Sequence, residues 1–179
     1  MLRILSVVFL LVYFVHGFSQ VNTQNITIAR DSFGVPHIFG KTDAEVAYGL
    51  AWAHAEDDFR NIQENLLAAK SMLGAAIGKD GLLFDFFVQY VGIDDLVEER
   101  FEKDLSDEFK KVLSAYVQAL NRYAELHPEE VLYKKALPFT EKDVIKGYSA
   151  ALNLFSGAGL YLRDIFKNEI KRFEEKDLP

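Results

Sequence analysis

The side chains that could do chemistry in this 179-residue chain are few and scattered. A hydrolase that works alone needs a nucleophile, a base within reach and a third group that orients the base. Beyond residues 1–19 the candidate bases are His37, His54 and His127, and no serine lies in the G-x-S-x-G pattern of a nucleophile elbow. His127 precedes Pro128 at an expected helix end, where interaction with the helix dipole is sufficient reason for it. The sequence therefore indicates no complete catalytic set in this chain.

The densest group of possible metal ligands is His54, Glu56, Asp57 and Asp58. Neighbouring helix positions point in different directions, and the pair of histidines four residues apart that typifies helical zinc sites is missing. The chain has no cysteine, which excludes disulfides, a thiol nucleophile and Cys-ligated zinc. We expect no metal and no cofactor to bind through it. Its net charge of −7 argues against a nucleic-acid partner.

The elements that would position these residues begin with a predicted β-hairpin. Apolar runs at 25–29 and 35–39 flank a turn-forming stretch, Asp31-Ser32-Phe33-Gly34, and Pro36 places the second strand at a sheet edge or bulge. Thr42 and Glu45 then form a capping box that begins a long amphipathic helix. One face of this helix is unusually rich in small residues, namely Ala44, Ala47, Ala51 and Ala55. We expect a partner chain to pack closely against this face.

The rest of the chain reads as further helices joined by short loops. Glycines in residues 71–83 predict a loop with a turn at Lys79-Asp80-Gly81, and the aromatic run 82–88 is interpreted as core or subunit contact, with substrate contact as the alternative. Ser106 caps a second amphipathic helix that Pro128 ends. Thr140 caps a third, which Gly157 and Gly159 break or kink. The pattern predicts an α+β fold that is mostly α-helical, with an N-terminal β-hairpin.

The hairpin and the helix after it also carry a family signature. Arg30-Asp31-x-x-Gly34-Val35-Pro36-His37-Ile38, followed by Gly49-x-Ala51-x-Ala53-x-Ala55-Glu56-Asp57, closely resembles the opening of the penicillin acylase family. Glu56 departs from the glutamine that usually stands there. The general arrangement of the sequence is nearest to that of the aculeacin and acyl-homoserine-lactone acylase branch of the family.

This resemblance implies an activity that needs a second chain. The family's members are N-terminal nucleophile hydrolases with an αββα fold, made as a precursor that is cut into an α and a β chain. The catalytic serine begins the β chain and its own α-amino group serves as base, since a free α-amino group has a pKa near 8. We therefore expect no catalytic residue here. The chain would be the α subunit, or a truncated precursor, of an acylase that cuts the amide bond of an N-acylated small molecule (β-lactam, acyl-homoserine lactone or lipopeptide type), inactive without its β subunit.

The resemblance also names two candidate substrate-binding residues. The family helix with an Asn-x-Phe-Ser sequence lies against the acyl pocket, and here it reads Asn153-Leu154-Phe155-Ser156. Phe155 would wall that pocket, and Leu154 stands where the penicillin G branch has an arginine. The alternative is that both are ordinary helix-packing residues. Calcium-binding members use a glutamate shortly after this motif, but residues 157–161 contain none, so no metal site is expected.

The two ends of the chain are expected to lie outside the folded domain. Residues 1–19 have the layout of a cleavable signal peptide, with Arg3, an apolar run and Gly17 and Ser19 before the cut. The alternative is an uncleaved anchor, but the run is shorter than the roughly 20 residues that span a bilayer. We expect an α-subunit domain at 20–165, a tail or spacer start at 166–179, and a periplasmic or secreted protein without a stable membrane anchor. The rival function is a secreted, acidic, non-catalytic helical interaction module.

Overall fold

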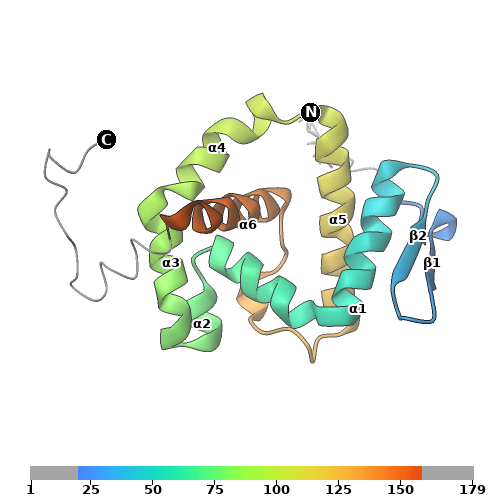
Figure 1. Ribbon diagram of the computed structural model, residues 1–179, viewed down its shortest axis with the longest axis horizontal. Coiled ribbons are helices and arrows are strands. Elements are labelled where there is room, and N and C mark those ends of the chain that lie inside the picture. The colour runs from blue at the N-terminus through green and yellow to red at the C-terminus, as the bar shows by residue number, and fades with distance from the viewer. Residues whose placement is uncertain (1–19, 159–179) are drawn as a thin grey trace, which may run out of the picture.

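The computed structural model describes residues 20–158. It is mostly helical, and a small hairpin lies against the outer side of the first helix (Figure 1). The elements run in the order η1 (Thr23–Asn25), β1 (Thr27–Arg30), β2 (Pro36–Phe39), α1 (Asp43–Ala69), α2 (Leu73–Ile77), α3 (Lys79–Val91), α4 (Ile93–Asp104), α5 (Asp107–Leu126), η2 (Lys134–Ala136), α6 (Glu141–Asn153) and the π-helical turn η3 (Leu154–Ala158). The predicted α+β class is confirmed.

The predicted hairpin forms, with β1 and β2 antiparallel and Ile28 opposite Ile38. Gly34 sits in the turn with φ +83°, a left-handed conformation that glycine adopts without strain. The sheet has two strands within residues 20–158, so Pro36 lies at an edge as predicted. The isoleucine side turns toward α1, where the methyl groups of Ile26 and Ile38 converge on Gly49. Gly49 lets the hairpin approach the helix closely.

The capping box at the start of α1 is confirmed. The Glu45 amide donates to Thr42 Oγ1 (3.2 Å) and the Thr42 amide donates to Glu45 Oε2 (3.1 Å). The helix is kinked rather than continuous, because Asp58 leaves the helical conformation (φ −161°, ψ 71°). Its carboxylate accepts from the amide of Asn61 (3.0 Å) and so caps the second half of α1. This is the competition between an aspartate side chain and helical hydrogen bonding.

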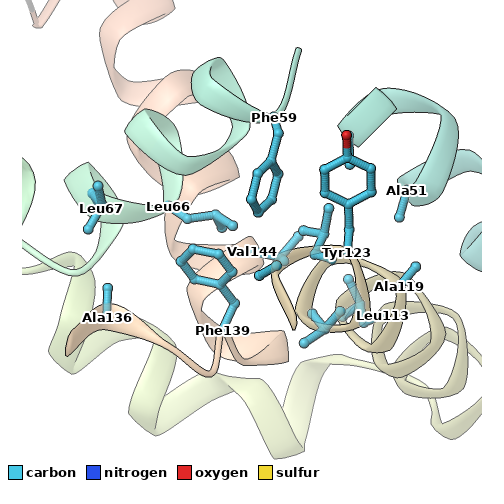
Figure 2. Packing of buried hydrophobic residues seen from close by; sticks show 14 of the residues in the cluster. Ala51, Phe59, Leu66, Leu67, Leu113, Ala119, Tyr123, Ala136, Phe139 and Val144 are labelled. Atoms are coloured by element: carbon cyan, nitrogen blue, oxygen red, sulfur yellow. The ribbon is translucent and has the colours of Figure 1, made fainter. Parts of the chain in front are cut away.

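The small-residue face of α1 is buried inside the chain, which corrects the expectation of a partner chain there. Ala51 and Ala55 are almost completely buried, and α1 packs more extensively on α5 than on any other described element. Ala119 of α5 is equally buried opposite this face (Figure 2). Small side chains on both helices let their axes come close. This contact between the small residues of α1 and α5, called the seam below, is therefore the main internal contact of the domain.

The aromatic core lies beside that seam. Figure 2 shows the rings of Phe59, Tyr123 and Phe139 gathered around Leu66 and Val144, which brings together α1, α5, α6 and the loop before α6. Each of these side chains is at least nine-tenths buried. Burial of such side chains stabilises the fold by roughly 1.5–3 kcal/mol apiece.

Residues 71–91 differ from prediction. The chain reverses at Gly78 (φ +79°), and Lys79-Asp80-Gly81 form the first turn of α3 instead of a loop. The sequence pattern did not predict these helices because they depend on a contact between distant residues. The Asp85 carboxylate accepts from the amides of Leu73 and Gly74 (both 2.8 Å) and so caps α2. The aromatic run is split between two environments. Phe87 and Val88 are buried, whereas Leu82 is 56% exposed.

Helix α4 is absent from the predicted elements because most of its residues are charged. Its apolar positions Ile93, Val97 and Phe101 are buried at a spacing of four, which is the signal that could have revealed it.

Helix α6 starts at the predicted Thr140 capping box. The Asp143 carboxylate accepts from the Thr140 amide (2.8 Å) and from Lys70 Nζ (2.9 Å), which ties the start of α6 to the end of α1. After α6 the chain turns through η3, where Gly157 has φ +95°. Between residues 20 and 158, no helix combines the length and apolar character needed to cross a membrane. The predicted signal peptide and the predicted tail or spacer start fall outside the described residues.

Candidate functional site

The hairpin motif is fastened to α1 by an ionic cluster around Arg30. Its guanidinium lies 2.8 Å from Asp57 Oδ1 and 3.2 Å from Glu56 Oε2, and it donates to the Gly34 carbonyl (3.0 Å). Hydrogen bonds to Asp57 and then Glu56 raise the pKa of Arg30 above its ordinary value. Glu56 also accepts from Trp52 Nε1 (2.9 Å). Two of the acidic residues considered as metal ligands therefore hold the hairpin in place.

Asp31 organises the hairpin turn. Its carboxylate accepts from the amides of Phe33 (2.9 Å) and Val35 (3.0 Å), and Oδ2 lies 3.2 Å from His37 Nε2. The hydrogen bond to His37, followed by those to the two amides, lowers the pKa of Asp31, so its ionised form favours the folded turn. An Asp–His pair is also how many hydrolases orient a base. Here the aspartate is engaged by turn amides and the His37 side chain is 54% exposed, which is the arrangement of a braced turn.

A cleft of about 750 Å³ opens between the N-terminal segment, α1 and α5. Tyr48 and Trp52 line one wall and stack on each other with ring centres 6.5 Å apart. The opposite wall includes Asn121, whose side chain both donates to and accepts from the Phe139 backbone (2.9 and 2.8 Å). Arg122 pairs with Glu125 (2.9 Å). The sequence did not indicate this cleft, because its walls come from segments about 70 positions apart.

The two predicted substrate-binding residues lie in η3, at the end of the chain's last described helix. Leu154 is partly buried and packs against the core. Phe155 is 88% exposed. Local hydrogen bonds shape the turn, with Asn153 Nδ2 donating to the Ser149 carbonyl (2.9 Å) and Ser156 Oγ donating to that of Asn153 (2.7 Å). Figure 1 places this end of α6 beside α3 and α4, on the opposite side of the domain from the hairpin.

One group among the described residues has a possible metal-ligand geometry. His127, Glu129 and Glu130 bring one ligand atom each within 4.8 Å of one another. His127 stacks on Tyr123 (4.2 Å between ring centres), and both glutamates are exposed. In the same part of the chain, no buried side-chain nitrogen or oxygen lacks a hydrogen-bond partner. These residues lie at a helix end whose exposed carboxylates have not been arranged around a binding site, and we assign no metal to them.

The residues that the sequence singled out thus lie in two separate regions of the described chain. The motif residues of the hairpin and α1 bind one another, whereas Phe155 is presented outward at the far end of α6. Leu154 and Phe155 are neighbours in η3, and the end of α6 that precedes them lies across the domain from the hairpin (Figure 1). Their role toward substrate stays a prediction.

Comparisons with known proteins bear on the whole chain. A sequence profile described as penicillin amidase matches residues 25–173. The penicillin acylase 2 proenzyme of Pseudomonas sp. (strain SE83) is 31% identical over 100 residues, which cover 55% of this chain and 12% of that protein. The acyl-homoserine lactone acylase PvdQ of Pseudomonas fluorescens (strain Pf0-1) is 27% identical over 139 residues, covering 78% of this chain and 15% of that protein.

A solved structure shows the same fold. The thermostable penicillin G acylase from Alcaligenes faecalis superposes with a TM-score of 0.62 at 22% identity, covering 74% of each chain. The matched profile contains both the hairpin and the helix that carry the motif, and these elements fold as predicted. The chain belongs to the penicillin amidase family.

Proposed function

We propose that this chain is the α subunit, or a truncated precursor, of an exported acylase that hydrolyses the amide bond of an N-acylated small molecule. The observation that carries the proposal is the profile match over residues 25–173, which contains the hairpin–helix motif in its folded context. The relatives are named penicillin acylase and acyl-homoserine lactone acylase, which supports β-lactams or acyl-homoserine lactones as the substrate class. A lipopeptide substrate rests on the motif resemblance alone.

The subunit assignment is supported by relative lengths. The chain spans 12% and 15% of the two curated relatives, one of which is named a proenzyme. In the solved penicillin G acylase, by contrast, the match covers 74% of both chains, so the matched chain there is of similar length to this one. A β subunit from the same precursor would supply the serine nucleophile, its α-amino base and the oxyanion hole. The α chain alone would be inactive.

Within that subunit, Phe155 and Leu154 would form one wall of the acyl pocket. The exposure of Phe155 supports this role, because a large apolar side chain that is 88% exposed has its surface available to another chain or to substrate. Leu154, anchored in the core, would fix the position of the turn. The apolar side chain of Leu154 suits an aliphatic acyl group.

The proposal includes the layout of the chain. Residues 1–19 would be a signal peptide that directs the protein to the periplasm or outside the cell. Residues 20–165 would form the α-subunit domain, and 166–179 a tail or the start of the spacer.

The test is to read the DNA downstream of codon 179 and to co-express the chain with the β chain encoded there. Hydrolysis of penicillin G and of short- and long-chain acyl-homoserine lactones is then measured with both chains and with each alone. We expect activity only from the pair. A folded chain without any encoded β chain would instead favour the interaction module.

Phe155→Ala in the active pair tests the pocket assignment. It should lower kcat/KM for substrates whose acyl chain reaches the ring by about 1–3 kcal/mol in transition-state free energy. Leu126→Ala is the control, because Leu126 is 49% exposed at the end of α5. Equal losses for short and long acyl chains would contradict a pocket role.

A further inference from the structure

An apolar groove of about 390 Å³ runs between α1, α5 and α6. Leu50 of α1, Phe109, Val112 and Tyr116 of α5, and Ile145 and Tyr148 of α6 contribute to its walls. All its lining side chains are aliphatic or aromatic, and two tyrosines supply the hydroxyl groups. A pocket that orients a small polar ligand has several convergent polar groups. This groove is suited to apolar side chains.

Two lysines next to the groove form ion pairs that point away from it. Lys146, adjacent to Ile145, pairs with Asp94 of α4 (2.6 Å). Lys110, adjacent to Phe109, pairs with Glu102 of α4 (2.7 Å). Both cations are thus neutralised by α4, and the groove they adjoin stays apolar. An occupant gains from burying apolar surface there and needs no complementary charge.

The groove continues as an apolar stripe along α6. Tyr148 and Leu152 are each 68% exposed and Phe155 is 88% exposed, at positions four and three residues apart on one helical face. Phe109 (45%) and Leu50 (37%) extend this surface onto α5 and α1. Isolated exposed apolar residues are ordinary, but a contiguous patch next to a groove marks an interaction site.

The amount of chain outside this sequence argues for the occupant. Curated relatives are several times longer, since the matched segment is 12–15% of their length. Most of the acylase in this family therefore lies beyond the segment that this chain represents, and it must pack on some surface of these helices. The small-residue seam of α1 is already filled by α5, whereas the groove and the stripe are open and apolar. Exposed apolar residues also lie on α3, such as Leu82 and Tyr90, but they do not line this groove.

We propose that the α1–α5–α6 groove is a docking site for an apolar segment of the β chain, and that this contact fixes α6 so that Phe155 faces the substrate. The proposal rests on the proposed function. It adds that one surface serves both subunit assembly and positioning of the acyl-pocket wall. Tyrosine and other aromatic residues are enriched in such contacts because they combine apolar area with a polar tip.

The experiment uses the chain co-expressed with the β chain encoded downstream and measures how much β chain an affinity-tagged α chain retains. Tyr148→Asp and Leu152→Asp place a charge in the groove mouth and on the stripe. Each should reduce retention roughly ten-fold, the size expected when a buried interface residue is lost. Tyr148→Phe, which keeps the ring, should retain the β chain as the wild type does, and Leu126→Asp is the matched exposed control. Thermal unfolding of each variant shows that it is folded, and Leu152, at 68% exposure, keeps the test valid if Tyr148→Asp is unstable.

The outcomes separate the two proposals. If the wild-type chain retains no β chain, the subunit assignment fails and the docking site with it. If the wild type retains it and both aspartate variants retain it equally well, the groove assignment alone is overturned. A dimer of the chain itself that the aspartate variants disrupt would assign the groove to a second copy and also overturn the proposal.

Discussion

The hairpin end and the α6 end of this domain use their side chains in opposite ways. At the hairpin end, Arg30, Asp31 and Glu56 look reactive in the sequence but are bound to one another or to backbone amides. At the α6 end, Leu152 and Phe155 look like ordinary helix residues but lie exposed. The recognisable motif thus builds the scaffold, and the exposed apolar end of α6 lies across the domain from it (Figure 1).

The difference has a steric origin. A hairpin that crosses a helix closely requires a particular turn and a missing side chain, and these requirements fix residue types at Gly34 and Gly49. An exposed apolar stripe requires only suitable spacing, which many sequences satisfy. Substitutions that affect the two ends should therefore differ in kind, with folding affected at the hairpin and association or substrate use at α6.

At the hairpin end, the largest effect is expected from Gly49→Ala. A Cβ atom there would lie 2.6 Å from Ile38 Cγ2 and 2.9 Å from Ile26 Cγ2, and β-branched side chains have little freedom to move away. The free energy of unfolding should fall by about 1–3 kcal/mol, despite the better helix propensity of alanine. Chemical denaturation measures it. An unchanged midpoint would show that the hairpin is not seated on α1.

A smaller loss is expected from Thr42→Ala, which removes one half of the capping box. The Glu45 amide would lose its acceptor at 3.2 Å, and N-cap losses of this kind cost about 1 kcal/mol. Thr42→Ser keeps the hydroxyl and should restore most of the stability. Equal losses in both variants would mean that the methyl group of Thr42, not its hydroxyl, matters.

Local patterns in the sequence predicted much of the fold. The hairpin, both capping boxes and the Ser106 cap follow from nearby residues. What could not be predicted depends on distant partners. Asp85 caps α2 from 11 and 12 positions away, and the seam of α1 is filled by α5, more than 50 positions along the chain.

The candidate site was predicted less completely for the same reason. The motif named Leu154 and Phe155, but the spacing alone did not distinguish the anchored leucine from the exposed phenylalanine. The groove between α1, α5 and α6 was not predicted at all, because no local pattern shows which helix faces remain uncovered in a three-helix contact. Glu56 and Asp57 of the ionic cluster were considered only as possible metal ligands, and Arg30, lying 26 positions before Glu56, was not identified as their partner.

Gly147→Ala is the matched counterpart of Gly49→Ala in α6 and should have the opposite sign. A Cβ atom at Gly147 would meet Ala69 Cβ at 3.9 Å and the Asn65 carbonyl at 4.0 Å, which are ordinary contacts. Where there is space for a Cβ atom, replacing an interior helix glycine by alanine should raise the free energy of unfolding by roughly 0.5–1 kcal/mol. Denaturant titration of the two alanine variants side by side checks the contrast. A loss of stability for Gly147→Ala would mean that α6 packs on α1 more tightly than these distances indicate.

The smallest effect on folding is expected from Phe155→Ala. The side chain is 88% exposed, so its removal takes little apolar surface out of the core, and the free energy of unfolding should change by less than about 0.5 kcal/mol. Phe139→Ala is the buried control, because Phe139 is 3% exposed in the aromatic core and its loss should cost about 3–5 kcal/mol. Both are measured by thermal or chemical unfolding of this chain on its own. Substantial destabilisation by Phe155→Ala would show that the ring contributes to the core of this chain, and α6 would then resemble the hairpin end instead of contrasting with it. An unchanged stability together with a loss of activity in the proposed α/β pair would place the contribution of Phe155 outside the fold of this chain.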